Sequence, residues 1–252
     1  MKKTILPALA MLIVAAVMLS TASYAWFAMS DEVYAENMQV SITSDAANLV
    51  IAKTSNAITG DPTYNELKWT IDRGRVELLP TANVGAKSTD FASDGIWYTQ
   101  NSDNPNSSVG TSGSKKNIPA AELDGKYALV ETFYIGVTAG SNNMYDLQAR
   151  ATIENDDTND QASIAALRVL VVCTDLESGF QTFSTTVSNY EGAKVLAEEI
   201  SPERPVEVKV YVYYDGNDTT VNSVNLSAGT IADAKITVYF TASKTASEQS
   251  GD

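Results

Sequence analysis

Oxygen-bearing side chains gather in residues 154–160, which read Glu-Asn-Asp-Asp-Thr-Asn-Asp. Three residues of this run stand at the spacing of the first ligands of a calcium loop: Asn155, Asp157 and Asn159. The rest of the pattern is missing, because the Gly and the final Glu of such a loop are replaced by Asp160 and Ala166. We interpret the run as a solvated polar turn, with calcium binding as the alternative, and expect no other cofactor. The Asp-Gly-Asn-Asp turn at residues 215–218 is interpreted in the same way.

Nucleophilic and general-base chemistry is limited by the composition. The chain has no histidine and a single cysteine, Cys173. The usual general base, the usual zinc ligand and the Ser/His and Cys/His arrangements of hydrolases are therefore absent. Cys173 ends the apolar run 167–173, where a free cysteine behaves as a small buried hydrophobe. We expect no catalytic residue, and no metal site apart from the calcium alternative.

Carboxylates alone can hydrolyse glycosides, since the required separation of two carboxyl groups is spatial and not sequential. Glu131 has the least usual position of the carboxylates, on the apolar face of an alternating run. We interpret it as a place where a strand bends or meets solvent. Three tyrosines expected on exposed strand faces could bind sugar rings: Tyr211, Tyr213 and Tyr239. A carboxylate-based hydrolase and an adhesin or glycan-binding module are therefore alternative functions.

An apolar leader opens the chain and decides where these side chains act. Lys2 and Lys3 precede the apolar stretch 5–19, and small residues follow up to Ala25. This pattern is typical of an export signal, with cleavage between Ala25 and Trp26. A retained anchor is the alternative, because residues 4–30 carry no charge and about 20 apolar residues span a bilayer. We expect export by the Sec route, a signal peptidase as transient partner, and membrane contact only through this segment before cleavage.

The acidic balance restricts the partners of the exported chain. The net charge is −14, and loss of Lys2 and Lys3 with the leader changes it to −16. A surface this acidic repels nucleic acid and anionic lipid. We expect a protein that is extracellular or held at the cell surface, with no nucleic-acid partner.

Alternation of apolar and polar residues indicates strands along most of the remaining chain, because side chains of a strand alternate between its two faces. The clearest runs, of which the last is apolar on both faces, are 127–137, 145–154, 206–213, 235–240 and 167–173. Shorter strands are expected at 38–43, 48–52, 69–71, 76–79 and 96–99. The first of these carries three alternating apolar side chains near the start of the exported chain: Met38, Val40 and Ile42.

Three segments are expected to depart from this pattern. Residues 189–200 are predicted as the one helix, because apolar residues recur at helical spacing and Pro202 follows. Residues 100–117 are almost all polar or turn-forming and predict a long exposed loop within one domain. Residues 243–252 have little to bury and predict a disordered tail.

These elements predict an all-β protein. The expected architecture is an antiparallel two-sheet β-sandwich, jelly-roll-like, with one short helix and a preceding N-terminal signal helix. We expect a signal peptide at 1–25, a single β-sandwich domain at 26–242 and the tail at 243–252.

Several short motifs resemble a known family. They are Ser-Tyr-Ala-Trp-Phe at 23–27, Met-Gln-Val at 38–40, Tyr-Ile at 134–135 and Val-Tyr-Val-Tyr-Tyr-Asp-Gly-Asn-Asp at 210–218. In these motifs the chain resembles the secreted proteins of Gram-positive anaerobes that carry a SipW-type signal peptide, and more distantly TasA and camelysin. The likeness spans most of the chain, and its specific parts are the junction at 23–27 and the last motif.

The resemblance implies a jelly-roll subunit of the cell surface or extracellular matrix. In TasA-like proteins one subunit donates its N-terminal strand to the next, which implies copies of the chain, or related matrix subunits, as partners. Met38, Val40 and Ile42 are then the donor-strand candidates, because an added strand supplies ladder hydrogen bonds and side chains for pockets. Pairing of this strand within its own subunit is an equal alternative. Camelysin is classed as a protease, but we do not expect protease activity of this chain, because it has no His-Glu-x-x-His motif.

Overall fold

A computed structural model describes much of the chain from residue 34 onwards. The described residues are 34–35, 39–44, 48–61, 63, 66–72, 76–83, 97–100, 115–155, 164–173, 175–176, 179–186, 194–216, 218 and 234–244. The predicted signal segment 1–25, the Ala25–Trp26 junction and Met38 lie outside them, as do residues 101–114 and 245–252. No helix in the described part of the chain has the length and apolar character that a membrane crossing needs.

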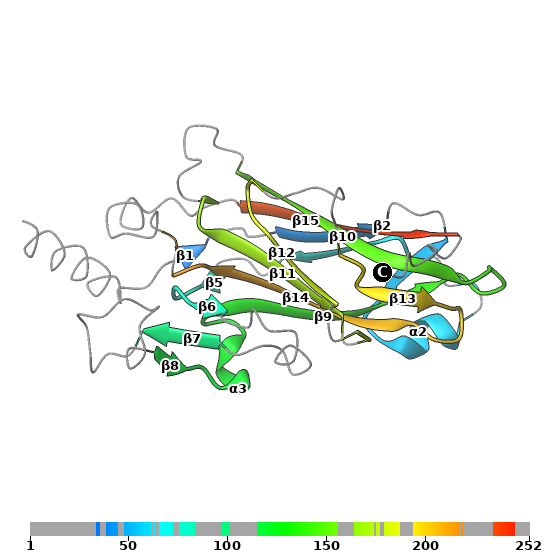
Figure 1. Ribbon diagram of the computed structural model, residues 1–252, viewed down its shortest axis with the longest axis horizontal. Helices are drawn as coiled ribbons and strands as arrows, with labels where there is room; N and C mark the ends of the chain where they lie inside the picture. Colours follow the sequence, from blue (N-terminus) through cyan, green and yellow to red (C-terminus); the bar gives the residue numbers. More distant parts are fainter. Residues whose placement is uncertain are drawn as a thin grey trace, which may run out of the picture.

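Two five-stranded sheets carry most of the structure (Figure 1). The first, called here the β10 sheet, has the order β13 (Ala197–Ile200), β10 (Met144–Asn155), β15 (Ala234–Ser243), β2 (Gln39–Ser44), β4 (Lys68–Asp72). The second, the β14 sheet, has the order β12 (Phe180–Phe183), β11 (Leu167–Cys173), β14 (Val206–Tyr214), β9 (Ala128–Val137), β3 (Leu49–Ala52). Neighbouring strands in both sheets are antiparallel, except β2 and β15, which are parallel.

The inward side chains of both sheets meet in one hydrophobic core. Every second residue of the long strands contributes to it, among them Ala149, Ala151 and Ile153 of β10 and Val208, Val210 and Val212 of β14. Phe133 of β9 meets Phe240 of β15 edge to face, with ring centroids 5.9 Å apart. Full burial of an aliphatic side chain stabilises the fold by about 1.5–3 kcal/mol, so this shared core fixes the inward face of each strand.

The outer face of the β14 sheet is covered at two places. A small sheet of β6 (Ala82–Asn83), β7 (Trp97–Gln100) and β8 (Lys115–Asn117), with helix α3 (Ala120–Leu123), covers one of them. There Trp97 lies 5.2 Å from the ring of Tyr211 and 4.9 Å from that of Tyr213. Helix α2 (Ser55–Thr59) covers the second place through Ile58, which packs on Val50 and Ala52. A two-stranded sheet pairs β1 (Tyr34–Ala35) with β5 (Val76–Glu77).

The all-β prediction is confirmed, and the strongly alternating strands lie close to their predicted positions. The run 167–173 coincides with β11, which is central and almost wholly buried, as expected. β14 and β15 extend past the predicted runs, and Ser243, placed in the predicted tail, ends β15 and pairs with Tyr145.

The predicted helix at 189–200 is wrong in its described part. Residues 194–196 are not helical, and Ala197–Ile200 form β13, which pairs with β10 in the register Met144↔Ile200 and Leu147↔Ala197. Ala197 and Ile200 are buried while the two residues between them are exposed. Buried residues three positions apart also occur on one face of a helix, and this short edge strand lacks the strict alternation that would have identified it as a strand. The sequence reading missed the short helices α2 and α3.

The predicted loop at 100–117 is also shorter than expected. Gln100 ends β7 and Lys115–Asn117 form β8, which pairs with β7. β8 reads Lys-Lys-Asn and has no apolar residue. β8 is therefore a strand only because it hydrogen-bonds to β7, and hydrophobic patterning could not predict it.

Candidate functional site

β2 holds two of the three predicted donor-strand residues, Val40 and Ile42, and lies inside its own sheet, whereas Met38 is outside the described residues. It runs between β15 and β4, with Val40 opposite Ile236 and Ile42 opposite Val238. Val40 and Ile42 are both 0% exposed and belong to the shared core. In the structure of the single chain, β2 therefore pairs within its own subunit, which is one of the two alternatives predicted for this strand.

The position of β2 in the chain is unusual for a strand between two others. It precedes every other strand of its sheet, while its parallel neighbour β15 is the last strand described. A parallel pair cannot be joined by a tight hairpin, so β2 is linked to β15 only through the rest of the chain. Its other neighbour, β4, follows after β3, which belongs to the opposite sheet. Side-chain burial and the two ladders therefore hold β2 in a slot between β15 and β4.

Glu131 is buried, so contact with solvent, one of the two interpretations of its place on an apolar face, is wrong. It is 7% exposed, and its register partner in β14 is Val210, a core residue. The Lys53 ammonium lies 2.5 Å from Glu131 Oε2 and 3.4 Å from the backbone oxygen of Thr132. The carboxylate therefore belongs to a partly buried ion pair. Within the described residues, no three Cys, Asp or Glu side chains are grouped so that they could hold a metal ion.

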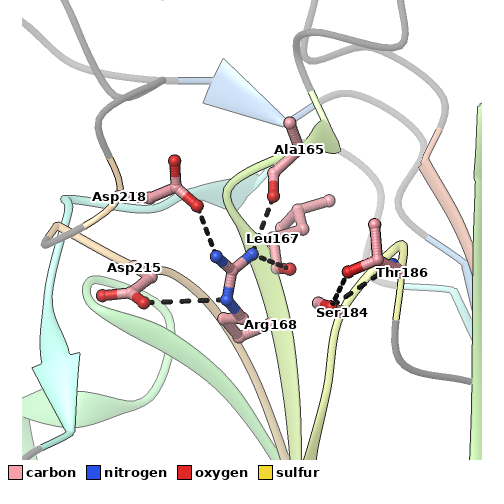
Figure 2. Close-up of polar contacts among 7 residues, drawn as sticks. All are labelled: Ala165, Leu167, Arg168, Ser184, Thr186, Asp215 and Asp218. Carbon is pink, nitrogen blue, oxygen red and sulfur yellow. Dashed lines mark hydrogen bonds and ion pairs between the residues drawn. The ribbon is translucent and has the colours of Figure 1, made fainter.

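The acidic turn at 215–218 is held by Arg168 of β11 (Figure 2). The guanidinium donates through Nη1 to the backbone oxygens of Ala165, at 2.7 Å, and Leu167, at 2.9 Å. Its Nη2 donates to Asp218 Oδ2, and its Nε lies 3.6 Å from Asp215 Oδ2. The two carboxylates are 25% and 18% exposed for Asp215 and Asp218, so the interpretation as a solvated turn is wrong.

Backbone contacts fix the same turn. Asp215 donates its N–H to Ala166 O at 3.0 Å, and Gly216 donates to Thr81 O at 2.8 Å. Thr81 in turn donates to Tyr214 O at 2.9 Å and, through its hydroxyl, to Tyr98 O at 2.7 Å. The last part of the motif 210–218 therefore ties β11, β14 and the small outer sheet together.

The expected tyrosine face is not formed. Tyr211 and Tyr213 are only 1% and 5% exposed, because Trp97 covers them. Burial, the largest cause, raises the pKa of the Tyr213 hydroxyl well above its ordinary value. Tyr239 is half-buried on the other sheet, with the Arg150 guanidinium 4.0 Å from its ring centroid. The three tyrosines therefore lie in different places and do not form one sugar-binding surface.

Cys173 is a buried free cysteine, as predicted. Burial raises the pKa of its thiol to about 11. A thiol with so high a pKa is almost wholly protonated at neutral pH and is a poor nucleophile. Of the calcium candidates, Asn155 ends β10, while Asp157 and Asn159 lie outside the described residues. The calcium alternative therefore stays a prediction.

Sequence reasoning missed three charged residues with structural roles: Arg168, Lys53 and Asp124. A signal for Arg168 was present, because it is the one charged residue in an otherwise apolar strand and such a charge needs a partner. Lys53 carries no comparable signal, since its contact with Glu131 depends on where β3 ends beside β9. Asp124 accepts the N–H of Val130 at 2.9 Å, and no local pattern indicates this contact.

Three comparisons with known proteins find no match: no family model, no curated protein and no solved structure is similar to this chain.

Proposed function

We propose that this chain is a structural protein of the cell surface or extracellular matrix, exported by the Sec route and joined into fibres by exchange of β2. In this proposal the two sheets form a jelly-roll-like β-sandwich, and the protein is not an enzyme. The observation that carries it is the place of β2 as the first strand of its sheet, paired with β15 and β4, with Val40 and Ile42 fully buried. The leader and the motifs similar to proteins with a SipW-type signal support the location.

The slot between β15 and β4 would bind a strand of this sequence equally well from its own chain or from a second copy. Residues 39–44 of a second copy would present the same ladder groups and the same Val40 and Ile42 side chains. Exchange of identical elements between protomers keeps these contacts, and its only added cost is the entropy that is lost on association. Each subunit that donates β2 forward has an empty slot for the next donor, so the exchange propagates as a fibre.

A disulfide across the β2–β15 ladder tests this proposal. Ser41 and Thr237 are register partners, so the double variant Ser41→Cys with Thr237→Cys places two cysteines on neighbouring strands. In a fibre formed by exchange, oxidation links each subunit to the next. A denaturing gel run without reductant should then show a ladder of covalent multimers, which reductant collapses to monomer.

Single variants and an out-of-register pair, Gln39→Cys with Thr241→Cys, serve as controls. Cys173 is buried and should not contribute. Fibres whose oxidised subunits all migrate as monomers would show that β2 stays in its own chain. An absence of fibres in secreted material, judged by negative-stain microscopy, would contradict the structural role itself.

A further inference from the structure

The short pair of β1 and β5 shares the register of the ladder between β2 and β4. Gln39 and Asp72 are partners at the end of that ladder. Five residues before Gln39, Tyr34 pairs with Glu77, which lies five residues after Asp72. The two antiparallel pairs therefore have one common offset, as the parts of a single ladder do. β1 and β5 lie at the end of the molecule opposite helix α2 (Figure 1).

β5 is fixed to the body of the subunit by the residues that follow it. Leu78 comes directly after β5 and is 0% exposed in the shared core. Two backbone hydrogen bonds follow, from Leu79 N–H to Lys126 O at 2.8 Å and from Thr81 N–H to Tyr214 O at 2.9 Å. None of these contacts involves β1, so they hold β5 in place whichever strand pairs with it.

The chain is also fixed just after β2. Asn48 O accepts hydrogen bonds from the Thr138 N–H, at 3.0 Å, and from the Thr138 hydroxyl, at 3.3 Å. Thr138 directly follows β9, which belongs to the opposite sheet. β1 and β2 precede this anchor in the chain, whereas β4 and β5 come after it. An exchange of β2 that leaves Asn48 in place therefore carries β1 away and leaves β5 behind.

We infer that β1 is donated together with β2, and that β5 of the receiving subunit is part of the site that binds the donor. This inference rests on the proposed exchange of β2. The partner that fits the site is a second copy of the chain, because the common register lets one donor pair with β4 and β5 at once. A slip of one residue would misalign both pairs together, so β5 also fixes the register of the donor.

Disulfides across the β1–β5 pair test the donation of β1 in the full chain. The two pairs of register partners are replaced in turn, as Tyr34→Cys with Glu77→Cys and as Ala35→Cys with Val76→Cys. Opposite residues of antiparallel strands have Cα atoms about 4.5 or 5.5 Å apart in alternation, and both distances suit a disulfide. The control is Tyr34→Cys with Val76→Cys, because cysteines one residue out of register lie on opposite faces.

Oxidised fibres of at least one in-register pair should give a ladder of covalent multimers on a denaturing gel without reductant. Reductant should return them to monomer, and the out-of-register pair should give monomer throughout. The Ser41→Cys with Thr237→Cys fibres are run beside them as the report on β2. A ladder from those fibres, with monomer bands from both β1–β5 pairs, would overturn the donation of β1 and leave the exchange of β2 standing.

Failure of the proposed function has a different signature. The β2–β15 pair and both β1–β5 pairs would then all give monomer bands after oxidation. Thiol labelling of the denatured monomers would find one free thiol per chain, that of Cys173, because the introduced cysteines are linked within each chain. This result would show that both strands stay in their own subunit, and it would overturn the exchange and the donation of β1 together.

Discussion

Arg168 is the only charged residue in β11, and its side chain is 17% exposed. Four acceptors surround its guanidinium: two backbone oxygens and the carboxylates of Asp215 and Asp218. A planar guanidinium can serve several acceptors at fixed angles, which an ammonium cannot. This explains why an arginine is accommodated at the end of an apolar strand, and why the motif at 210–218 ends in two aspartates.

Replacement of Arg168 should therefore be costly. Arg168→Ala removes the charge-assisted hydrogen bonds and leaves the half-buried carboxylates of Asp215 and Asp218 in one turn without their shared cation. We expect the free energy of unfolding to fall by about 2–3 kcal/mol, the scale of hydrogen bonds to charged groups. Arg168→Lys should recover only part of this loss. Urea unfolding followed by circular dichroism measures both changes.

Arg204 offers the matched control. Its guanidinium lies 2.7 Å from Asp175 Oδ1, but its side chain is 71% exposed. Exposed ion pairs contribute little, so Arg204→Ala should change the free energy of unfolding by less than about 0.5 kcal/mol. Equal effects of the two substitutions would show that burial of Arg168 has no special role.

Among the elements, the ease of prediction follows the strength of the alternation. β10 and β14 were predictable because each presents apolar side chains to a core at a period of two. β11 was predictable because it is apolar on both faces, as a strand buried on both sides requires. β13 was missed because an edge strand with two adjacent exposed residues has no such period. β8 was missed because its residues are polar and only its pairing with β7 makes it a strand.

The candidate site was predictable in part, for the same reason. The apolar alternation at 38–43 predicted a strand with Val40 and Ile42 on one face, and both are buried. Their partners Ile236 and Val238 were not predictable, because the register joins opposite ends of the chain in a parallel pair. The contact of Arg168 with Asp218 also spans 50 positions, and local patterning carries no information about it.

Helix α2 depends on a glycine of β9. A Cβ at Gly136 would lie 2.8 Å from Cγ2 and 2.9 Å from Cδ1 of Ile58, the buried residue of α2. Gly136→Ala should therefore push α2 away from the sheet and destabilise the fold by about 1–3 kcal/mol, as overpacking does. Thermal unfolding measures the effect.

A double-mutant cycle separates this clash from other effects of the substitution. Ile58→Ala removes the two nearest atoms and leaves only Pro205 Cβ, at 3.3 Å, so Gly136→Ala should cost clearly less in that background. Additive effects of the two substitutions would show that Ile58 is not the residue that requires glycine at position 136.

At the scale of the whole molecule, the proposed fibre depends on how β2 is held. β2 has no hairpin to its parallel neighbour β15, and β3 of the opposite sheet separates it in the chain from its other neighbour, β4. Under the proposed exchange each subunit would have one donor strand and one slot, so a fibre built in this way would have a defined subunit order.

The same reasoning predicts how a chain without β2 behaves. Removal of residues 26–44 together with the predicted signal segment takes away Val40 and Ile42, which are fully buried, and the ladders to β15 and β4. Loss of two buried aliphatic side chains alone amounts to about 3–6 kcal/mol, a large share of the stability of a domain. The shortened chain should therefore unfold at a much lower temperature than the full chain.

A synthetic peptide of residues 37–45 should restore the stability of the shortened chain. A ligand that binds only the folded state raises the free energy of unfolding by about 2.7 kcal/mol when its concentration is 100 times the dissociation constant. The same peptide carrying Val40→Ser and Ile42→Ser is the control, since it offers the ladder groups without the buried side chains. Rescue by the first peptide alone would show that the slot accepts β2 from another molecule, as fibre growth requires. A shortened chain that is as stable as the full chain, or that neither peptide stabilises, would mean that β2 cannot join one subunit to the next.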